Sequence, residues 1–420
     1  MRKQIEGSRA VAEAVALARP EVICAYPISP QTHIVEALSA IVKSGELQPC
    51  EYVNVESEFA AMSVAIGASA AGARAYTATA SQGLLFMVEA VYNASGLGLP
   101  IVMTVANRAI GAPINIWNDH SDSMSQRDSG WIQLFAQDNQ EALDLHIQAF
   151  KLAEEVSLPV MVCMDGFILT HAVEEVEMPD QGTVDEFLPP FEPRQVLDPA
   201  EPVSIGAMVG PEAFMEVRYL AHRRQMDALD VIPRIAEEYG QLTGRVRDGL
   251  VSHYRLDDAE VVVVALGSVL GTLQDTADLL RELGLKVGVL GITSFRPFPL
   301  DSVRAALASV SSVIVLEKAL AVGIGGIVTN NVRTALAGLT IPVRTVIAGL
   351  GGRPILVESL ATMIRGADDL EELTFLDLRT DLVERELERS RTTRKSGPTA
   401  ENLLRDVGAV GDPHSVRMAR

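Results

Sequence analysis

Cysteine is scarce in this sequence, and its three copies lie far apart. Cys24, Cys50 and Cys163 show no Cys-x-x-Cys spacing. Iron–sulfur clusters and cysteine-type zinc sites need several thiolates at short spacing, so we expect neither within this chain. Few and unpaired cysteines are typical of a reducing compartment, and we expect a cytoplasmic protein.

Basic residues and long apolar runs are also in short supply. Lys and Arg number 35 against 55 Asp and Glu, which gives a formal net charge of −20. Phosphate backbones need a basic surface, so we expect no nucleic-acid partner, whereas a basic protein or electron carrier is compatible with this charge. Apolar runs such as Val261 to Leu266 have strand length, so we expect no membrane span, and the N-terminal segment lacks a signal core.

The stretch from Val53 to Arg108 alternates short apolar runs with Ala- and Gly-rich helical segments. After a β-prone run near Val53, the expected elements are a helix at 59–71, a strand at 74–80, a tight turn at Ser81-Gln82-Gly83, a helix at 84–95 and a strand at 101–105. Short connections of this kind predict an α/β fold with a parallel sheet covered by helices. Ligands of such sheets bind where strands end, so we expect one crevice to be lined by Glu58, Ser81 to Gly83 and Arg108.

The remainder of the N-terminal half extends this α/β pattern. We expect helices at 5–18, 31–44 and 141–156, and strands at 22–25 and 160–164. The first of these strands ends in the loop Tyr26-Pro27-Ile28-Ser29-Pro30, which contains two prolines. Residues 111–131 form a long polar loop, and a loop of that length within a compact domain is usually functional.

The C-terminal half begins after a Pro- and acid-rich segment, 178–202, which we expect to be extended. A helix is predicted at 211–240, and a second α/β unit follows from Ala259, with strands at 261–266, 286–290, 313–316 and 343–347 and helices at 270–283 and 300–308. The tail from about Thr380 predicts one helix and then an arm. The expected domains are therefore 1–240, 241–370 and 371–420.

Several of these signals have two interpretations. Glu58 is either an ordinary acid at a helix N-terminus, favoured by the helix dipole, or a site carboxylate. Arg108 either pairs with a protein carboxylate or binds a substrate carboxylate, whose two oxygens match its planar fork. Asp119, His120 and Asp122 suggest a metal site, but no second histidine lies at ligand spacing, so we expect a polar loop and no metal.

The glycine-rich segment 323–326 lacks the third glycine of a dinucleotide-binding motif, so it predicts a close helix–strand crossing. Asn330 and Asn331 resemble half of a diphosphate-binding motif. The Gly-Asp-Gly half is absent, because Arg247-Asp248-Gly249 lacks the first glycine. We therefore expect the two asparagines to lie within a helix.

Considered together, these segments resemble the α subunit of the thiamine-diphosphate-dependent 2-oxoacid:ferredoxin oxidoreductases, typified by pyruvate:ferredoxin oxidoreductase. The resemblance covers most of residues 5–360 and rests on AYPISPQT (25–32), ESEFAA (56–61), TATASQGLLFM (77–87), VANRAI (105–110), DHSDSMSQRDSG (119–130), SFRPFP (294–299), LEKALAVGIGG (316–326) and GLGGR (349–353). Ser29 stands where the family usually has Thr. The fold implied is a pyrimidine-binding domain followed by a transketolase C-terminal-like domain.

The resemblance also implies roles for individual residues. Glu58 corresponds to the cofactor glutamate, which hydrogen-bonds the aminopyrimidine ring of thiamine, and Ser29 and Arg108 to the residues that hold the 2-oxoacid carboxylate. Pro27 and the Ser81-Gln82-Gly83 turn are the expected cofactor neighbours. The expected substrate loop contains Asn115, Trp117, Asp119, His120 and Asp122.

The implied reaction is oxidative decarboxylation of a 2-oxoacid, pyruvate by default, with CoA, giving acyl-CoA, CO2 and low-potential electrons. Thiamine diphosphate would be shared with a β subunit that carries the diphosphate half-site, and Mg²⁺ and iron–sulfur clusters would lie on partner subunits. We further expect γ and ferredoxin-like δ subunits, which assemble with this chain as a dimer of hetero-oligomers. The expected electron acceptor is ferredoxin or another acceptor.

Three alternatives remain open at this stage. The first is the same chemistry on a branched or aromatic 2-oxoacid, such as 2-oxoisovalerate or phenylglyoxylate, with NAD as the electron acceptor. A transketolase- or acetolactate-type enzyme is the second, but it needs a diphosphate motif in the same chain. The third is a non-catalytic structural subunit, which the presence of Glu58, Ser29 and Arg108 disfavours.

Overall fold

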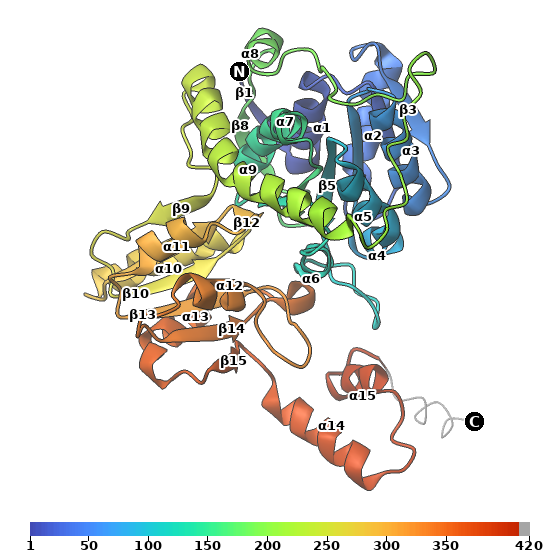
Figure 1. The fold of residues 1–420 in the computed structure, drawn as a ribbon. Coiled ribbons are helices and arrows are strands. Elements are labelled where there is room, and N and C mark those ends of the chain that lie inside the picture. Colours follow the sequence, from blue (N-terminus) through green and yellow to red (C-terminus); the bar gives the residue numbers. More distant parts are fainter. Residues whose placement is uncertain (411–420) are drawn as a thin grey trace. The chain divides into compact units, whose positions relative to one another are not determined.

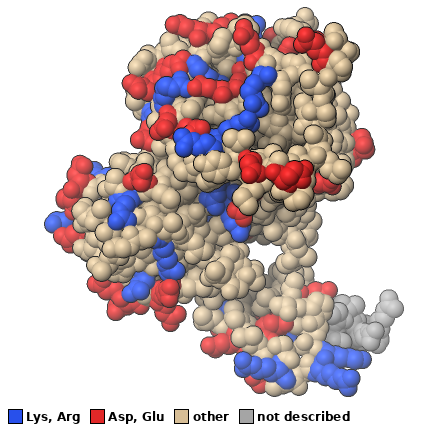
Figure 2. Space-filling model, viewed as in Figure 1, with Lys and Arg blue, Asp and Glu red and all other residues tan. Residues whose placement is uncertain are grey.

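The computed structural model describes residues 1–410, which form a large unit, Met1–Thr374, and a smaller unit that begins at Phe375 (Figure 1). In the described part of the chain, no helix has the length and apolar character needed to cross a membrane. Figure 2 shows acidic and basic side chains interspersed over one face of the molecule. Exposed ion pairs such as Arg19–Asp185 and Lys286–Glu260 contribute little to stability.

A seven-stranded sheet forms the centre of the N-terminal half. Its strands, in spatial order, are β12 (Ser294–Arg296), β6 (Ile132–Phe135), β7 (Val160–Asp165), β5 (Ile101–Asn107), β4 (Ala75–Thr79), β2 (Val22–Ala25) and β3 (Glu51–Asn54). The pairs from β6 to β3 are parallel, and β12 is antiparallel to β6. Every residue of β4, β5 and β7 is buried, as expected for parallel strands covered on both faces. The predicted α/β class is confirmed.

Helices pack on both faces of this sheet (Figure 1). They are α1 (Gly7–Leu17), α2 (Thr32–Ser44), α3 (Glu58–Ala70), α4 (Ser81–Phe86), α5 (Val88–Leu97) and α7 (Asn139–Val156). The small residues of α3 let it lie close to β2 and β4, where Cys24 donates its thiol to Ala61 O at 3.1 Å. The long helix α9 (Phe214–Thr243) packs on α7, and its prediction is confirmed.

The predictions for residues 2–6 and for the Pro-rich segment 178–202 are wrong. Residues 2–6 are the strand β1 (Arg2–Glu6), not the first turn of a helix, because they pair antiparallel with β8 (Val173–Glu177). The Pro-rich segment is not extended throughout, since it contains α8 (Gln181–Phe187). Asp180 caps that helix by accepting a hydrogen bond from Thr183 N at 2.9 Å.

A six-stranded sheet organises the C-terminal half. Its order is β15 (Leu373–Phe375), β14 (Val343–Ile347), β13 (Ser312–Glu317), β10 (Val261–Ala265), β11 (Val287–Ile292) and β9 (Val251–Tyr254). The helices of this half are α10 (Val269–Glu282), α11 (Leu300–Leu307), α12 (Val328–Ala335) and α13 (Val357–Arg365). The strand β12 follows β11 in the chain but belongs to the first sheet, so the two halves are joined by backbone hydrogen bonds.

The start of α12 explains the glycine-rich segment. Glu317, at the end of β13, accepts hydrogen bonds from the backbone N–H groups of Ile327, Val328 and Thr329 at 2.7–2.9 Å. A Cβ on Gly326 would lie 2.4 Å from the Glu317 carboxylate, so this close crossing needs glycine. Asn330 and Asn331 lie within α12, as predicted.

The smaller unit contains α14 (Thr380–Thr392) and α15 (Thr399–Asp406). The expectation of one helix followed by an arm is therefore wrong for 399–406, and the end of that arm, 411–420, lies outside the described residues. Arg389 joins the two helices by donating to both Asp406 oxygens at 2.9 and 2.8 Å.

Candidate active site

Glu58 is the first residue of α3, at the edge of the sheet where the parallel strands end. The Ser57 hydroxyl caps this helix by accepting from Ala60 N at 3.2 Å. The side chain of Glu58 is buried, with only 8% of the residue exposed, yet within residues 1–410 its carboxylate has no hydrogen-bond partner. An acid of this kind is available to bind a ligand.

A second polar group without a partner lies beside this acid. The buried Thr79 hydroxyl, at the end of β4, has no hydrogen-bond partner in the part of the chain that the structure describes. A Cβ on Gly83 would lie 2.5 Å from Thr79 Oγ1 and 2.7 Å from Glu58 Oε1, so any side chain at position 83 would collide with both groups. The glycine therefore leaves the carboxylate and the hydroxyl facing the same space.

The Ser81-Gln82-Gly83 segment is the first turn of α4, not a free turn before a longer helix. Ser81 adopts a positive φ of 48°, and its hydroxyl donates to Ala109 O at 2.5 Å. The backbone N–H of Ser81 donates to Asp122 at 3.0 Å. These contacts fix the start of α4, because they connect it to the end of β5 and to the loop beyond.

Arg108 follows β5 and meets the loop that carries Ser29. Its Nη1 donates to Ser29 O at 3.0 Å, and its Nε donates to Asn115 O at 2.9 Å. Burial lowers the pKa of the Arg108 guanidinium, although the Asp122 carboxylate opposes that shift. Ser29 and Pro27 are exposed residues of the loop after β2, and Arg108 contacts Ser29 through the backbone carbonyl.

Asp122 lies at the centre of this network, in the short helix α6 (Ser121–Ser125). Its carboxylate accepts from Ser81 N, Arg108 N, Asn107 Nδ2 and Ser123 N at 2.7–3.0 Å. Burial raises the pKa of Asp122 to about 7, although these N–H donors favour the charged form. The Asp122 side chain is fully buried, and its expected place among the substrate-loop residues stays a prediction. It positions Ser81 and Arg108.

His120 is also turned inward, toward the second sheet. Its Nε2 lies 2.6 Å from Asp165 Oδ1, at the end of β7. Asp165 Oδ2 accepts from Lys318 Nζ at 2.7 Å and from Ser268 N at 3.1 Å. Burial alone would raise the pKa of Asp165, but Lys318 and His120 hold it well below its usual range. This buried network joins the two halves of the large unit.

Asp119 makes a similar connection. Its Oδ2 accepts from Gly351 N at 3.0 Å, and its Oδ1 accepts from Ser121 N at 2.9 Å. Both Asp119 and His120 are buried against protein, and their expected contact with substrate stays a prediction. Asp119 binds the backbone N–H groups of Gly351 and Ser121, and His120 binds the Asp165 carboxylate. These hydrogen bonds fix the loop 111–131.

Asn115 and Trp117 occupy the outer part of the loop. Asn115 Nδ2 donates to Gly351 O at 3.1 Å, and its Oδ1 accepts from Trp117 N at 2.7 Å. Trp117 is 56% exposed and Ile114 is 81% exposed. A Cβ on Gly352 would lie 2.4 Å from Trp117 Cβ, so glycine permits this approach. The apolar side chains of the loop are therefore accessible to a ligand or to another chain.

The sequence reasoning missed Asp165, Lys318 and Ser268. Asp165 is the last residue of β7, and Lys318 and Ser268 follow β13 and β10, which is the position where side chains gather at one edge of a parallel sheet. Lys318 also lies within the segment LEKALAVGIGG, to which the sequence reasoning assigned no role. The signal was therefore present, but nothing in the sequence showed that the edges of the two sheets meet.

Replacement of Lys318 by Met is expected to destabilise the chain by about 3–5 kcal/mol, because it leaves the buried Asp165 charge without its cationic partner. Urea unfolding of the purified chain would measure the loss. The matched control is Lys286→Met, which removes an exposed ion pair with Glu260 and should change little. Equal stability of the two variants would contradict the structural role of the Lys318 network.

Comparison with solved structures identifies the class of fold. A 2-oxoglutarate:ferredoxin oxidoreductase from Magnetococcus marinus, determined with 2-oxoglutarate, coenzyme A and succinyl-CoA bound, aligns with a TM-score of 0.65 at 20% identity, over 87% of this chain and 65% of that chain. A split-gene transketolase in an inactive β4 tetramer aligns with a TM-score of 0.52 at 15% identity, over 88% of this chain and 99% of the other. The chain thus has the two-domain α/β fold shared by these proteins.

Comparison of sequences narrows the class to a family. Residues 13–237 match the family described as "Pyruvate flavodoxin/ferredoxin oxidoreductase, thiamine diP-bdg", and residues 259–360 match "Pyruvate:ferredoxin oxidoreductase core domain II". The pyruvate synthase subunit PorA of Methanosarcina barkeri is 48% identical over 90% of this chain and 97% of its own length. The ketoisovalerate oxidoreductase subunit VorA of Pyrococcus abyssi is 40% identical over 89% of this chain and 94% of its own length. The chain belongs to the pyruvate flavodoxin/ferredoxin oxidoreductase family.

Proposed function

We propose that this chain is the α subunit of a complex that oxidatively decarboxylates pyruvate with CoA, giving acetyl-CoA, CO2 and low-potential electrons. The observation that carries the proposal is the buried Glu58 carboxylate without a protein partner, within a domain that matches a thiamine-diphosphate-binding family. Identities of 45–48% to PorA subunits against 39–40% to VorA subunits favour pyruvate over a branched acid.

The residues around Glu58 fit the aminopyrimidine part of thiamine diphosphate. When bound, this cofactor supplies an electron sink for cleavage of the bond between the carboxylate and keto carbons. Glu58 would hydrogen-bond a nitrogen of this ring, and the Thr79 hydroxyl, which has no partner within the described residues, would supply a second polar contact. Gly83 leaves room for the ring, while Pro27, Ser81 and Gln82 border the same region in this proposal.

Arg108 is the proposed anchor for the substrate carboxylate. A guanidinium has five N–H donors, and two of its nitrogens already bind Ser29 O and Asn115 O. These contacts orient the planar fork, so the remaining N–H groups are held ready for a carboxylate. The Ser29 side chain, on the exposed loop at the same place, is the proposed second contact.

The rest of the complex supplies what this chain lacks. The sequence has no Gly-Asp-Gly motif, so we assign the diphosphate half-site and its Mg²⁺ to a β subunit, and iron–sulfur clusters to further subunits of the γ and ferredoxin-like δ type. Ferredoxin is the proposed acceptor, and the assembly is a dimer of hetero-oligomers in the cytoplasm. Within this chain the proposed domains are 1–240, 241–370 and 371–420. The strand β12 belongs to the second of these domains by its position in the sequence, but it pairs with the sheet of the first.

Cofactor binding and turnover test this assignment. The purified chain alone should be inactive and should not retain thiamine diphosphate, whereas the native complex should convert pyruvate and CoA to acetyl-CoA with reduction of ferredoxin. Calorimetric titration of the chain with thiamine diphosphate and Mg²⁺, and an assay of the complex, provide the two measurements. Tight stoichiometric binding by the isolated chain would overturn the shared site.

The exposed part of the loop 111–131 is the proposed determinant of substrate range. Because an apolar contact discriminates by only about 1–3 kcal/mol per methylene, Ile116→Ala and Trp117→Ala should each shift the ratio of kcat/KM between pyruvate and 2-oxoisovalerate by roughly tens-fold without abolishing turnover. Steady-state kinetics on the assembled complex would measure this ratio. Leu285→Ala, at a half-exposed apolar position of the second half, is the control. An unchanged ratio in both loop variants would exclude the loop as the specificity element.

A further inference from the structure

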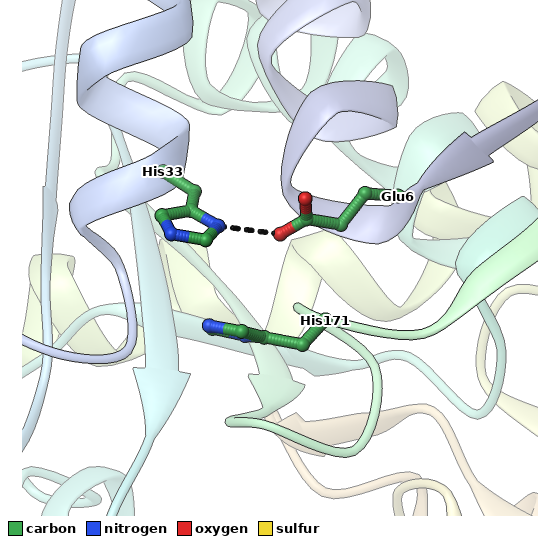
Figure 3. Close-up of side chains that lie close together, drawn as sticks. All are labelled: Glu6, His33 and His171. Carbon is green, nitrogen blue, oxygen red and sulfur yellow. Dashed lines mark hydrogen bonds and ion pairs between the residues drawn. The ribbon is translucent and has the colours of Figure 1, made fainter.

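Glu6, His33 and His171 form a cluster of ligand-type side chains outside the site described above (Figure 3). One ligand atom from each of the three residues lies within 4.8 Å of the other two. His33 Nδ1 is 2.6 Å from Glu6 Oε1, and the two imidazole rings lie over one another with centroids 4.7 Å apart. Three side chains from distant parts of the sequence thus converge on one point.

The donor set and its spacing suit a transition metal. Two imidazoles and a carboxylate are the ligands that Zn²⁺ takes at an open site, where a water molecule completes the coordination. Metal–ligand bonds of about 2.0–2.1 Å place tetrahedral ligands roughly 3.3 Å apart. The Glu6–His33 pair is already closer than this, and the His171 ligand atom lies within 4.8 Å of both.

The surroundings of His171 prepare it for metal binding. The Thr170 hydroxyl lies 2.7 Å from His171 Nδ1, and it accepts from Phe167 N at 2.8 Å. When Nδ1–H donates to that hydroxyl, Nε2 carries the lone pair, which is the tautomer that a metal requires.

We propose that Glu6, His33 and His171 bind a divalent transition-metal ion, for which Zn²⁺ is the expected occupant, with Thr170 orienting the His171 ring. The ion takes the place of the hydrogen bond between His33 Nδ1 and Glu6, any proton on Nδ1 moves to Nε2 or is released to solvent, and His171 becomes the third protein ligand. It binds at a position that none of the proposed catalytic residues occupies.

The location gives the ion a consequence for the active site. Glu6 ends β1, His33 lies in the first turn of α2, and His171 follows the turn after β7. A Cβ on Gly166, in that turn, would lie 2.5 Å from the Pro30 ring, so the turn already packs against the residue next to Ser29. A bound ion would link His33, which follows the Ser29 loop, to His171, which follows the turn at Gly166. It would therefore restrain the loop that Arg108 contacts. This consequence rests on the proposed function, whereas metal binding does not.

Metal titration of the full-length chain, freed of metal by a chelator, tests the site. Co²⁺ should give visible d–d bands of a low-coordinate ion at a stoichiometry of one, Zn²⁺ should displace it, and Zn²⁺ should raise Tm because it binds the folded state. His171→Ala and Glu6→Gln should lower the affinity at least tenfold, and Thr170→Val by about tenfold through loss of ring orientation. His253→Ala removes an exposed histidine elsewhere and should change nothing.

Several results would overturn the proposal. Absence of Co²⁺ bands, or Zn²⁺ affinity that is equal in the wild type, His171→Ala and His253→Ala, means that Glu6 and His33 form only an ion pair. Circular dichroism of each variant checks folding, and Glu6→Gln retains nearly the same size and shape at its position. Metal binding that depends on all three residues supports the site even if the native complex does not oxidise pyruvate, so failure of the proposed function is recognised separately.

Discussion

Replacement of Glu58 by Gln is expected to lower the kcat of the assembled complex by about 10²- to 10⁴-fold, the range typical of losing a general acid–base group. An amide cannot donate a proton to a cofactor ring nitrogen and take it back, as a carboxylic acid can. Pyruvate-dependent reduction of ferredoxin would measure the loss. The effect should fall mainly on kcat, because the substituted amide still fills the same volume beside Thr79 and Gly83.

The structure also predicts that Glu58→Gln keeps the fold intact. The Glu58 carboxylate has no protein hydrogen-bond partner within residues 1–410, so the substitution breaks no internal contact and Tm should not fall. Glu56→Gln is the matched control, since it changes an exposed acid two positions earlier and should retain activity. Near-normal turnover of Glu58→Gln would show that another residue serves the cofactor. A large fall in Tm would show a structural role instead.

Replacement of Arg108 by Lys is expected to lower kcat/KM about equally for pyruvate and 2-oxoisovalerate. An ammonium is a point charge, so it cannot bind Ser29 O, Asn115 O and a substrate carboxylate with the geometry of a planar fork. Hydrogen bonds to charged groups contribute about 1.5–3 kcal/mol, which corresponds to a loss of about 10- to 150-fold. Steady-state kinetics with both acids would measure the two losses.

The control for Arg108 is Arg19→Lys, which alters an exposed pair with Asp185 and should leave both rates unchanged. Comparison with the loop variants gives a second control. Arg108→Lys acts on the group that all 2-oxoacids share, whereas Ile116→Ala and Trp117→Ala act on the group that differs. A loss confined to one acid would contradict the role of Arg108 as the common carboxylate anchor.

The parallel strands were predictable because most of them are short, largely apolar runs bounded by turn residues. Strands 22–25 and 343–347 were predicted with the bounds that the structure gives. The short strand β12 was not predicted, and neither was β1 as a strand. A three-residue strand has no periodicity of its own, and β1 forms because β8, far away in the sequence, offers its backbone. Local patterns do not contain such pairings.

The candidate site also has a part that was predictable from the sequence and a part that was not. The positions of Glu58 and Arg108 after predicted strands placed both at one edge of the sheet, and the structure brings Arg108 to the Ser29 loop. The inward direction of Asp122 and His120 was not predictable, because it depends on N–H groups and charges supplied by other segments. A polar loop has no internal sign of which side chains face solvent.

The sequence by itself determined the α/β class, the family and the absence of a Gly-Asp-Gly half-site, because these depend on residue types in a linear order. Only the tertiary structure decided that Glu58 lacks a hydrogen-bond partner among residues 1–410, that Asp165 joins His120 to Lys318, and that Glu6, His33 and His171 meet. Some of these contacts connect residues more than a hundred positions apart. Their existence depends on which strand edges and helix ends the packed core brings together, and on where burial removes water as the competing partner.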